Sequence, residues 1–279
     1  MHELYGNTQT DTLDSRELLS LAEELIGGNT EEAFGAYFFT SNSPFAELGR
    51  QVERSVFLEA FGNTEEQLRY EYGRYEPTSV FFCILDQRRK VPAGVIRVIL
   101  PSAYPGLKSL NDIEPVWDRS VDELIGQSAL PLSLARTWDV ATLAVDKAYQ
   151  SAAAIGLASL GLYQSVTRTA QRCGIDWVVA ILDLVVYRMS RWKFHTPFRG
   201  FNGAPPLPYL GSAASLPVWC RLSEWEERLK EADPVLHEVI FKGSGIEAAL
   251  RPLDVEAACQ EIIAMSETVS LMSPLALVD

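Results

Sequence analysis

Two short segments are β-branched and mostly apolar, and each carries one ionisable residue in its interior. Segment 93–101 contains Arg97, and segment 138–146 contains Asp139. This pair constrains the fold more than any other feature of the sequence, because a charged side chain inside a buried strand is costly unless it is paired or has a chemical role. We therefore expect a strand pair in which Arg97 and Asp139 either pair with each other or belong to a functional site.

Apolar periodicity predicts helices, and β-branched or aromatic runs predict strands. The expected helices are 15–26, 45–61, 64–72, 152–173, 185–192, 224–231 and 253–265. The expected strands are 79–85, 91–100, 138–145, 175–182 and 217–222. Thr64 and Gln67 form the pattern of a helix capping box. The first two strands flank the polar turn 86–90, which predicts an antiparallel hairpin. The continuous apolar run 175–182 is typical of a central strand buried on both faces.

This order of elements predicts an α/β fold with a mixed, partly antiparallel sheet and helices on both faces. We expect a single domain over residues 1–279, with a helical extension at 1–45 and a C-terminal helix and tail at 246–279. Segment 101–136 is rich in Pro, Gly, Ser and Asp, and its weak periodicity predicts an active-site flap or a long excursion. Segment 197–208 is expected to be an irregular loop.

Composition and charge exclude several classes of protein. The net charge of −13 argues against nucleic acid as a partner, because binding to its backbone needs an excess of Lys and Arg. No basic leader with an apolar core precedes residue 15, and no run of about 18 apolar residues predicts a membrane span. The cysteines show no metal-ligand or CxxC spacing, which predicts free thiols in a reducing, cytoplasmic environment.

Blocks of sequence, taken in order, resemble the GNAT-fold N-acyltransferase superfamily. Within it, the resemblance is to the acyl-homoserine-lactone (autoinducer) synthases and the long-chain N-acyl amino acid synthases. The matching blocks are Arg54–Gly62 and Tyr75–Glu76, Gly94–Ser102, Trp138–Asp146 and Val186–Arg191. Ala141 and Thr142 replace the family's Ser-Arg pair, and Gly73 replaces the first Asp of its loop motif.

The resemblance implies acyl transfer from a thioester to an amine, with acyl-CoA or an acyl-phosphopantetheine as co-substrate and no bound cofactor. The segment 147–153 stands where CoA-using members have a glycine-rich nucleotide loop, and it contains no glycine. Because glycine permits the closest approach of backbone to a pyrophosphate, an acyl carrier protein fits this sequence better than CoA.

Asp139 is the candidate base that takes the proton of the acceptor amine, provided that desolvation raises its pKa. The structural alternative is an ion pair with Arg97. Arg97 could hold Asp139 or Glu76 in place or bind an acceptor carboxylate, and its alternative is a surface-facing arginine. The strands of Arg97 and Asp139 are expected to form opposite walls of a thioester cleft, and the sheet is expected to open between 138–145 and 175–182.

Tyr187 is the candidate general acid for the leaving thiolate, with a packing role in the core or at an interface as its alternative. The resemblance assigns substrate and thioester contacts to the strand positions Trp138, Ala141, Thr142 and Val145. A backbone N–H of 140–145 would meet the oxyanion. No metal site is expected, because His195 and His237 have no acidic or Cys partner at ligand spacing.

Arg188, Arg191 and Lys193, with Arg199, form the densest basic cluster of this acidic chain. They are candidates for docking a carrier protein or CoA phosphates, and ordinary surface charge is the alternative.

The sequence as a whole predicts an N-acyltransferase acting on a small metabolite, amino acid or peptide. A non-catalytic GNAT-fold module that binds an acyl ligand or a protein is the alternative. A further one is an interaction protein whose apolar C-terminal helix packs on a partner, which could be a second copy in a homodimer.

Overall fold

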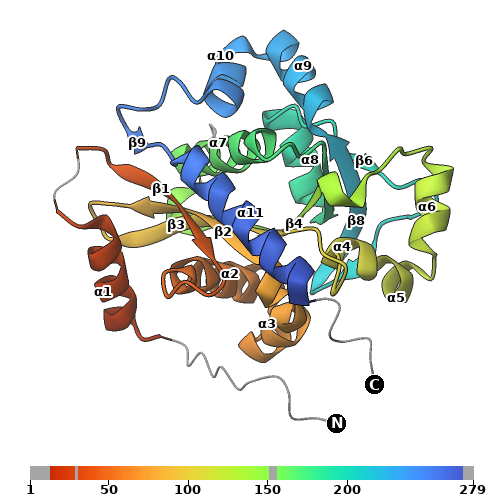
Figure 1. Ribbon diagram of the computed structural model, residues 1–279, viewed down its shortest axis with the longest axis horizontal. Coiled ribbons are helices and arrows are strands. Elements are labelled where there is room, and N and C mark those ends of the chain that lie inside the picture. Colours follow the sequence, from red (N-terminus) through yellow and green to blue (C-terminus); the bar gives the residue numbers. More distant parts are fainter. Residues whose placement is uncertain (1–12, 29–30, 151–155, 273–279) are drawn as a thin grey trace.

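The computed structural model describes residues 13–28, 31–150 and 156–272, and its strands form one nine-stranded sheet (Figure 1). The strand order is β6-β8-β5-β4-β3-β2-β1-β9, and β7 pairs with β8. The strands are β1 (Phe34–Thr40), β2 (Ser79–Asp86), β3 (Val91–Ile99), β4 (Thr137–Val145), β5 (Trp177–Asp183), β6 (Arg199–Gly200), β7 (Leu207–Tyr209), β8 (Ser212–Arg221) and β9 (Leu250–Arg251).

The longer α-helices are α1 (Ser15–Ile26), α2 (Ala46–Phe61), α3 (Glu65–Tyr72), α7 (Leu157–Arg172), α8 (Leu184–Lys193), α9 (Leu222–Ala232) and α11 (Val255–Met272). The short ones are α4 (Lys108–Asn111), α5 (Ile113–Trp117), α6 (Val121–Gln127) and α10 (Pro234–His237). Short stretches of other helix types are η1 (Gly73–Thr78), η2 (Leu134–Arg136), η3 (Lys147–Tyr149) and η4 (Glu238–Lys242). No helix in these described ranges is long and apolar enough to cross a membrane.

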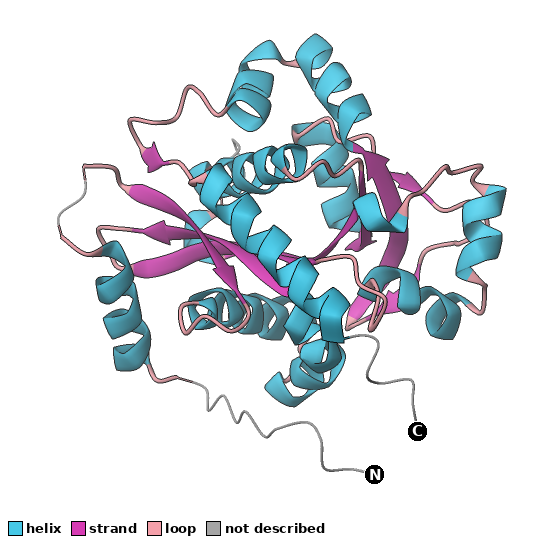
Figure 2. Cartoon of the chain, in the orientation of Figure 1, coloured by secondary structure: helices cyan, strands magenta, loops and turns pink. Residues whose placement is uncertain are grey.

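Helices cover both faces of the sheet, as expected (Figure 2). On one face, α7, α9 and α11 pack against alternate side chains of the central strands, such as Phe82, Ile96 and Val218. On the other face, α1 and α2 cover the neighbouring positions, such as Phe81 and Val95. Alternate residues of β2 and β3 point to opposite faces of the sheet, so their apolar side chains contribute to two separate cores. The mixed α/β sheet predicted from the sequence is confirmed.

Local sequence signals account for several elements. The β2–β3 hairpin is antiparallel, with Phe81 opposite Arg97, as the polar turn predicts. Thr64 and Gln67 form the expected capping box at the start of α3. The expected helix 152–173 is described from Leu157, and its first residues, 152–155, lie outside the described part of the chain.

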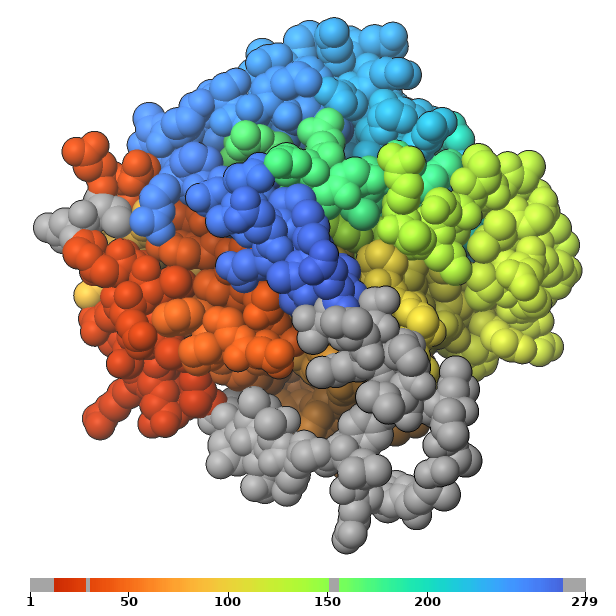
Figure 3. Space-filling model, in the orientation of Figure 1, coloured from red at the N-terminus to blue at the C-terminus, as the bar shows by residue number. Residues whose placement is uncertain are grey.

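Other elements differ from the expectation. Segment 101–136 contains α4, α5 and α6 and forms the yellow-green lobe in Figure 3. Its apolar side chains form a separate cluster against β5. Helices of four to seven residues are too short to produce a periodic signal, so this segment was expected to be a loop. The expected helical extension at 1–45 also contains β1, which pairs with β2, and segment 197–208 contributes β6 and part of β7.

Candidate active site

The sheet opens between β4 and β5. The two strands are parallel and pair only from Thr137 to Asp139, opposite Trp177 to Val179. Beyond Asp139, β4 continues on β3, whereas β5 continues on β8. Among the described residues, no strand pairs with the β5-facing side of segment 140–145. The predicted opening between these two strands is therefore present.

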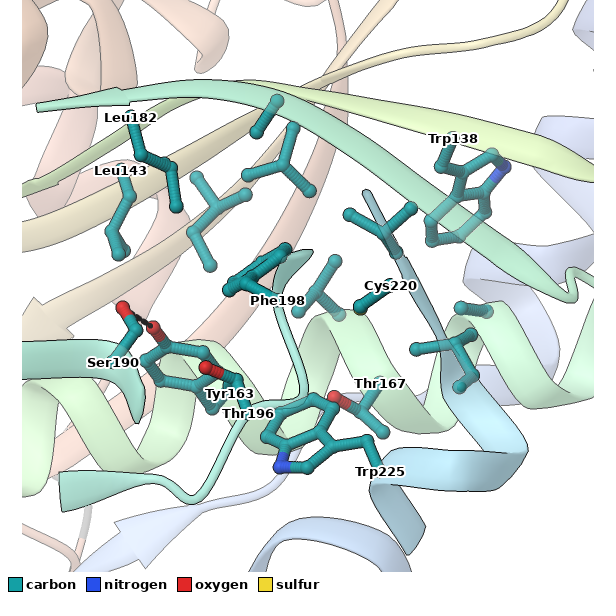
Figure 4. A pocket seen from close by; sticks show the side chains of 17 residues that line it. Trp138, Leu143, Tyr163, Thr167, Leu182, Ser190, Thr196, Phe198, Cys220 and Trp225 are labelled. Atoms are coloured by element: carbon teal, nitrogen blue, oxygen red, sulfur yellow. Dashed lines mark hydrogen bonds between the residues drawn. The ribbon is translucent and has the colours of Figure 1, made fainter. Parts of the chain in front are cut away.

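An apolar cavity of about 50 Å³ lies beside this opening, on the α7 side of the sheet (Figure 4). Its sheet wall includes Trp138, Val140 and Leu143 from β4 and Ala180 and Leu182 from β5. Helix α7 and the segment that follows α8 supply the facing wall, as Figure 4 shows. Trp138, one of the expected thioester-contact positions, therefore lines a cavity.

Beside the opening, a β-bulge in β4 changes which face of the sheet its side chains point to. Arg97 of β3 lies opposite Thr142, but the next residue, Val98, lies opposite Val140, so Ala141 is the extra residue. Val140, which precedes the extra residue, lies on the cavity side, and the bulge turns Thr142 to the other face, where its hydroxyl donates to Glu53. Bulges commonly occur where an active site needs side chains redirected.

Asp139 is fully buried on the face opposite the cavity. Its carboxylate accepts hydrogen bonds from the Ser109 backbone N–H at 2.7 Å and from the Ser109 hydroxyl at 2.6 Å. Burial raises the pKa of Asp139 to about 6, against the lowering effect of the Ser109 bonds and of Lys108. A carboxyl with that pKa is mostly ionised at pH 7 yet basic enough to take a proton.

Arg97 is also buried, with 3% of its side chain exposed, and it forms ion pairs with Glu53 and Glu76. Glu53 accepts from Arg97 Nε at 2.9 Å and from Nη2 at 2.7 Å. Glu76 accepts from Arg97 Nη1 at 2.7 Å and from Arg50 at 2.7 Å. Burial alone would raise the pKa of Glu76, but Arg97 and Arg50 outweigh it and hold this pKa below its usual value.

These contacts correct two expectations. Arg97 and Asp139 do not pair, because each has its own partners from different helices. Their strands are adjacent and antiparallel, with Ile99 opposite Asp139, so they are not opposite walls of a cleft. Arg97 does hold Glu76, as one of its expected roles required, and it is not a surface arginine.

Lys108, next to Ser109, anchors the segment that covers Asp139. Its ammonium contacts Glu71 at 2.8 Å, the Tyr209 hydroxyl at 2.8 Å, and Asp112. Burial would lower the pKa of Lys108, but these carboxylates raise it above its usual value. Helix α4 is thus fixed over Asp139 by a buried ion pair.

Sequence reasoning missed Glu53 and Ser109. Glu53 follows Val52 and precedes Val56 by three positions, so it lies on the expected apolar face of its helix. A carboxylate on an apolar helix face indicates a buried polar partner, and this position could have been found from the sequence. Ser109 lies in the segment without periodicity and gave no signal. Its role depends on a tertiary contact, thirty residues away in sequence.

The remaining expected site positions are placed as follows. Val145 is partly buried at the end of β4 and packs on the α7-side core. Tyr187 donates to the Phe198 carbonyl at 3.4 Å and accepts from Arg191 at 2.7 Å. Its general-acid role stays a prediction, and its hydroxyl is engaged by structural partners.

Helix α8 presents an exposed apolar stripe. Val185, Met189 and Trp192 are spaced at i, i+4 and i+7, and Val185 and Trp192 are 71% and 75% exposed. Arg188 and Arg191 lie between them on the exposed surface, and Lys193 follows at the end of the helix. The predicted basic cluster thus combines positive charge with apolar surface, at the end of the strand that borders the opening.

No family model matches the sequence, and a search of curated proteins finds no match. Among solved structures, FeeM, an N-acyl amino acid synthase from uncultured soil microbes, is 18% identical with a TM-score of 0.52; the match covers 74% of this chain and 100% of FeeM. TofI, in a ternary complex with an inhibitor and MTA, is 17% identical with a TM-score of 0.49, covering 72% and 99%. The CoA-dependent acyl-homoserine lactone synthase BjaI is 17% identical with a TM-score of 0.47, covering 82% and 99%.

The likeness to FeeM shows the fold. The chain has a GNAT-like α/β fold, similar to that of this N-acyl amino acid synthase, and the fold expected from the sequence is confirmed.

Proposed function

We propose that this protein is an N-acyltransferase that moves an acyl group from a thioester to the amino group of a small acceptor. The observation that carries the proposal is the opening between β4 and β5, with the apolar cavity on one side of β4 and Asp139 on the other. The almost entirely apolar lining of the cavity matches the polarity of an acyl chain, and its volume of about 50 Å³ requires side chains to move when a long chain enters. The fold supports the same class of reaction.

The reacting carbonyl belongs at the opening itself, where both faces of β4 are within reach. The unpaired edge of 140–145 offers backbone groups to the amides of a phosphopantetheine arm, as an added strand would. The acceptor nitrogen, after losing a proton to Asp139, attacks the thioester carbon. The tetrahedral intermediate then collapses to an amide and expels the thiolate, which takes up the second proton that the nitrogen loses.

Asp139 is covered by α4 in this arrangement, and Ser109 occupies both of its oxygens. Proton transfer to Asp139 therefore requires that α4 move aside or that a water molecule relay the proton. Arg97 acts as a positioning residue, because its contacts fix Glu53 and Glu76 beside the bulge.

An acyl carrier protein is the proposed donor, docking on α8. The apolar stripe and the arginines between its residues suit a partner that presents acidic and apolar side chains together. The Arg188→Glu variant should raise KM for a carrier-bound thioester and leave KM for the free pantetheine thioester unchanged. Arg88→Glu, an exposed arginine on the β2–β3 turn, is the matched control for the change in charge.

The test of the function is thiol release from acyl thioesters of increasing chain length, with and without a panel of amines. We expect amine-dependent release that Ala180→Leu reduces for long chains and not for acetyl, because Ala180 lines the cavity. Cys83→Val, buried on the opposite face, is the control for core repacking. Binding of acyl ligands without any thiol release would instead support a non-catalytic module.

A further inference from the structure

Two thiols meet where the C-terminal end of α7 contacts α11. The Cys173 thiol donates a hydrogen bond to Cys259, and their Sγ atoms lie 2.7 Å apart. Both thiols are free. A disulfide holds its two sulfur atoms about 2.05 Å apart, so the bond can close with a movement of less than about 1 Å. Neither residue belongs to the candidate active site.

The local structure fixes Cys173 at the end of α7. Its backbone N–H donates to the Thr169 carbonyl at 2.9 Å. The next residue, Gly174, has a φ of 70°, which ends the helix, and its carbonyl accepts from Arg136 Nε at 3.0 Å. Because the backbone is held on both sides, the partly exposed thiol of Cys173 stays beside α11.

Helix α11 is fixed at its start in the same way. The Asp254 carboxylate accepts from the Ala257 backbone N–H at 3.0 Å, and Cys259 follows in the next turn with 2% of its side chain exposed. Beside the thiols, Glu256 accepts from Arg172 Nε at 2.6 Å and from Nη2 at 2.7 Å. This ion pair aligns the two helices, but both of its side chains are 54% exposed, so it contributes little to stability.

Packing alone holds α11 weakly. Of the α11 side chains that the structure describes, only those of Ala258, Cys259 and Ile262 are buried, whereas most of α7 is buried. An element with few buried apolar contacts opens locally before the whole protein unfolds. A covalent bond at Cys259 would therefore supply an attachment that the packing of α11 lacks.

We propose that Cys173 and Cys259 are oxidised reversibly to a disulfide by small disulfides such as oxidised glutathione, and that this bond fastens α11 to α7. The inference does not depend on the proposed acyl transfer. Helix α11 also contacts η1, the segment that contains Glu76 (Figure 1). The disulfide thus fastens a helix that reaches the candidate active site.

Cys173 reacts first, because it is partly exposed and Cys259 is buried. Its thiolate attacks one sulfur of oxidised glutathione, whose S–S bond breaks and releases one glutathione thiolate. Cys259 then loses its proton and attacks the Cys173 sulfur, which releases the second glutathione thiolate. The two protons that the cysteines lose go to the two released thiolates. The protein loses two electrons, and oxidised glutathione gains them.

The pH should control the rate of this exchange. Burial, followed by the hydrogen bond to Cys259, raises the pKa of the Cys173 thiol well above its usual value, and the nearby Arg172 lowers it by less. The reactive form is the thiolate, so the reaction should be slow at neutral pH and about tenfold faster for each unit of pH below that pKa.

The experiment incubates the purified protein with oxidised glutathione in neutral and alkaline buffers, and measures the intact mass without reductant. We expect the wild type to lose two hydrogens, faster in alkaline buffer, and to regain them with dithiothreitol. Cys83→Ala, a thiol buried on the opposite face, should behave like the wild type. Cys173→Ser and Cys259→Ser should not lose the two hydrogens. A stable glutathione adduct on the wild type, or no change of mass in alkaline buffer, would overturn the proposal.

Hydrogen exchange and thermal unfolding test whether the bond fastens α11. In the reduced protein, the amides of α11 should exchange faster than those of α7, and oxidation should slow the first turns of α11 by about tenfold or more. The bond closes a loop between residues 86 positions apart, so oxidation should raise Tm by about 4–10 °C. Cys173→Ser, treated in the same way, should show neither change. An oxidised protein in which α11 exchanges at the rate of the reduced one would refute the fastening of α11.

Discussion

The buried carboxyl of Asp139 should make the stability of this protein depend on pH in a specific direction. Its pKa is raised by burial from 3.8 to about 6 in the folded protein, so the folded state binds more protons than the unfolded state between these values. The free energy of unfolding therefore falls as the pH rises through this range. At about 1.4 kcal/mol per pKa unit, the full effect corresponds to about 3 kcal/mol.

Asp139→Asn isolates this contribution, because asparagine keeps the shape and does not titrate. The difference in unfolding free energy, wild type minus variant, should fall by about 2 kcal/mol between pH 4.5 and pH 7.5. The change in hydrogen bonding to Ser109 shifts this difference by a constant amount and leaves its slope intact. Other ionisable groups titrate in both proteins and largely cancel.

The assay is urea unfolding of both proteins at several pH values in this range, with a common ionic strength. A difference that does not change with pH would refute the reasoning, because it would show that Asp139 titrates alike in the folded and unfolded chains. A difference that rises with pH would show that its hydrogen bonds outweigh its burial.

Further predictions concern the surroundings of the site and the core. Glu53→Gln should lower the free energy of unfolding by about 3–5 kcal/mol in denaturant titrations, because it leaves the buried Arg97 underpaired, whereas Glu59→Gln on the surface should change little. Ser109→Ala removes a donor to Asp139 and should move the acid limb of the kcat/KM profile to higher pH; an unmoved limb would argue against Asp139 as the base. Gly161→Ala should destabilise by about 1–3 kcal/mol, since its Cβ would lie 2.5 Å from Leu250 and 2.8 Å from Ile84, whereas Gly126→Ala, which meets open space, should stabilise α6 by up to about 1 kcal/mol.

Long elements with strong periodicity could be predicted from the sequence, and short ones could not. Helix α1 has the predicted bounds of 15–26, and β2, β3 and β4 differ from expectation by a residue at their ends. Strand β1 was missed although its run from Phe34 to Thr40 is aromatic-rich, because it lies alone between helical patterns and its pairing with β2 is a tertiary contact.

The positions of Arg97 and Asp139 on adjacent strands could be predicted, but their partners could not. Strand alternation says which face a residue takes only if no bulge intervenes, and the extra residue Ala141 shifts the face of everything after it. The partners come from α2 and α4, at sequence separations that local patterns do not encode.

The most direct test of the central claim is thiol release from a carrier-bound or pantetheine-bound long acyl chain, measured with and without amines. The structure predicts release that depends on the amine, yields an N-acyl product by mass spectrometry, and falls by about 10²–10⁴ in Asp139→Asn. The absence of amine-dependent release with every thioester and amine of the panel would contradict the assignment as an N-acyltransferase.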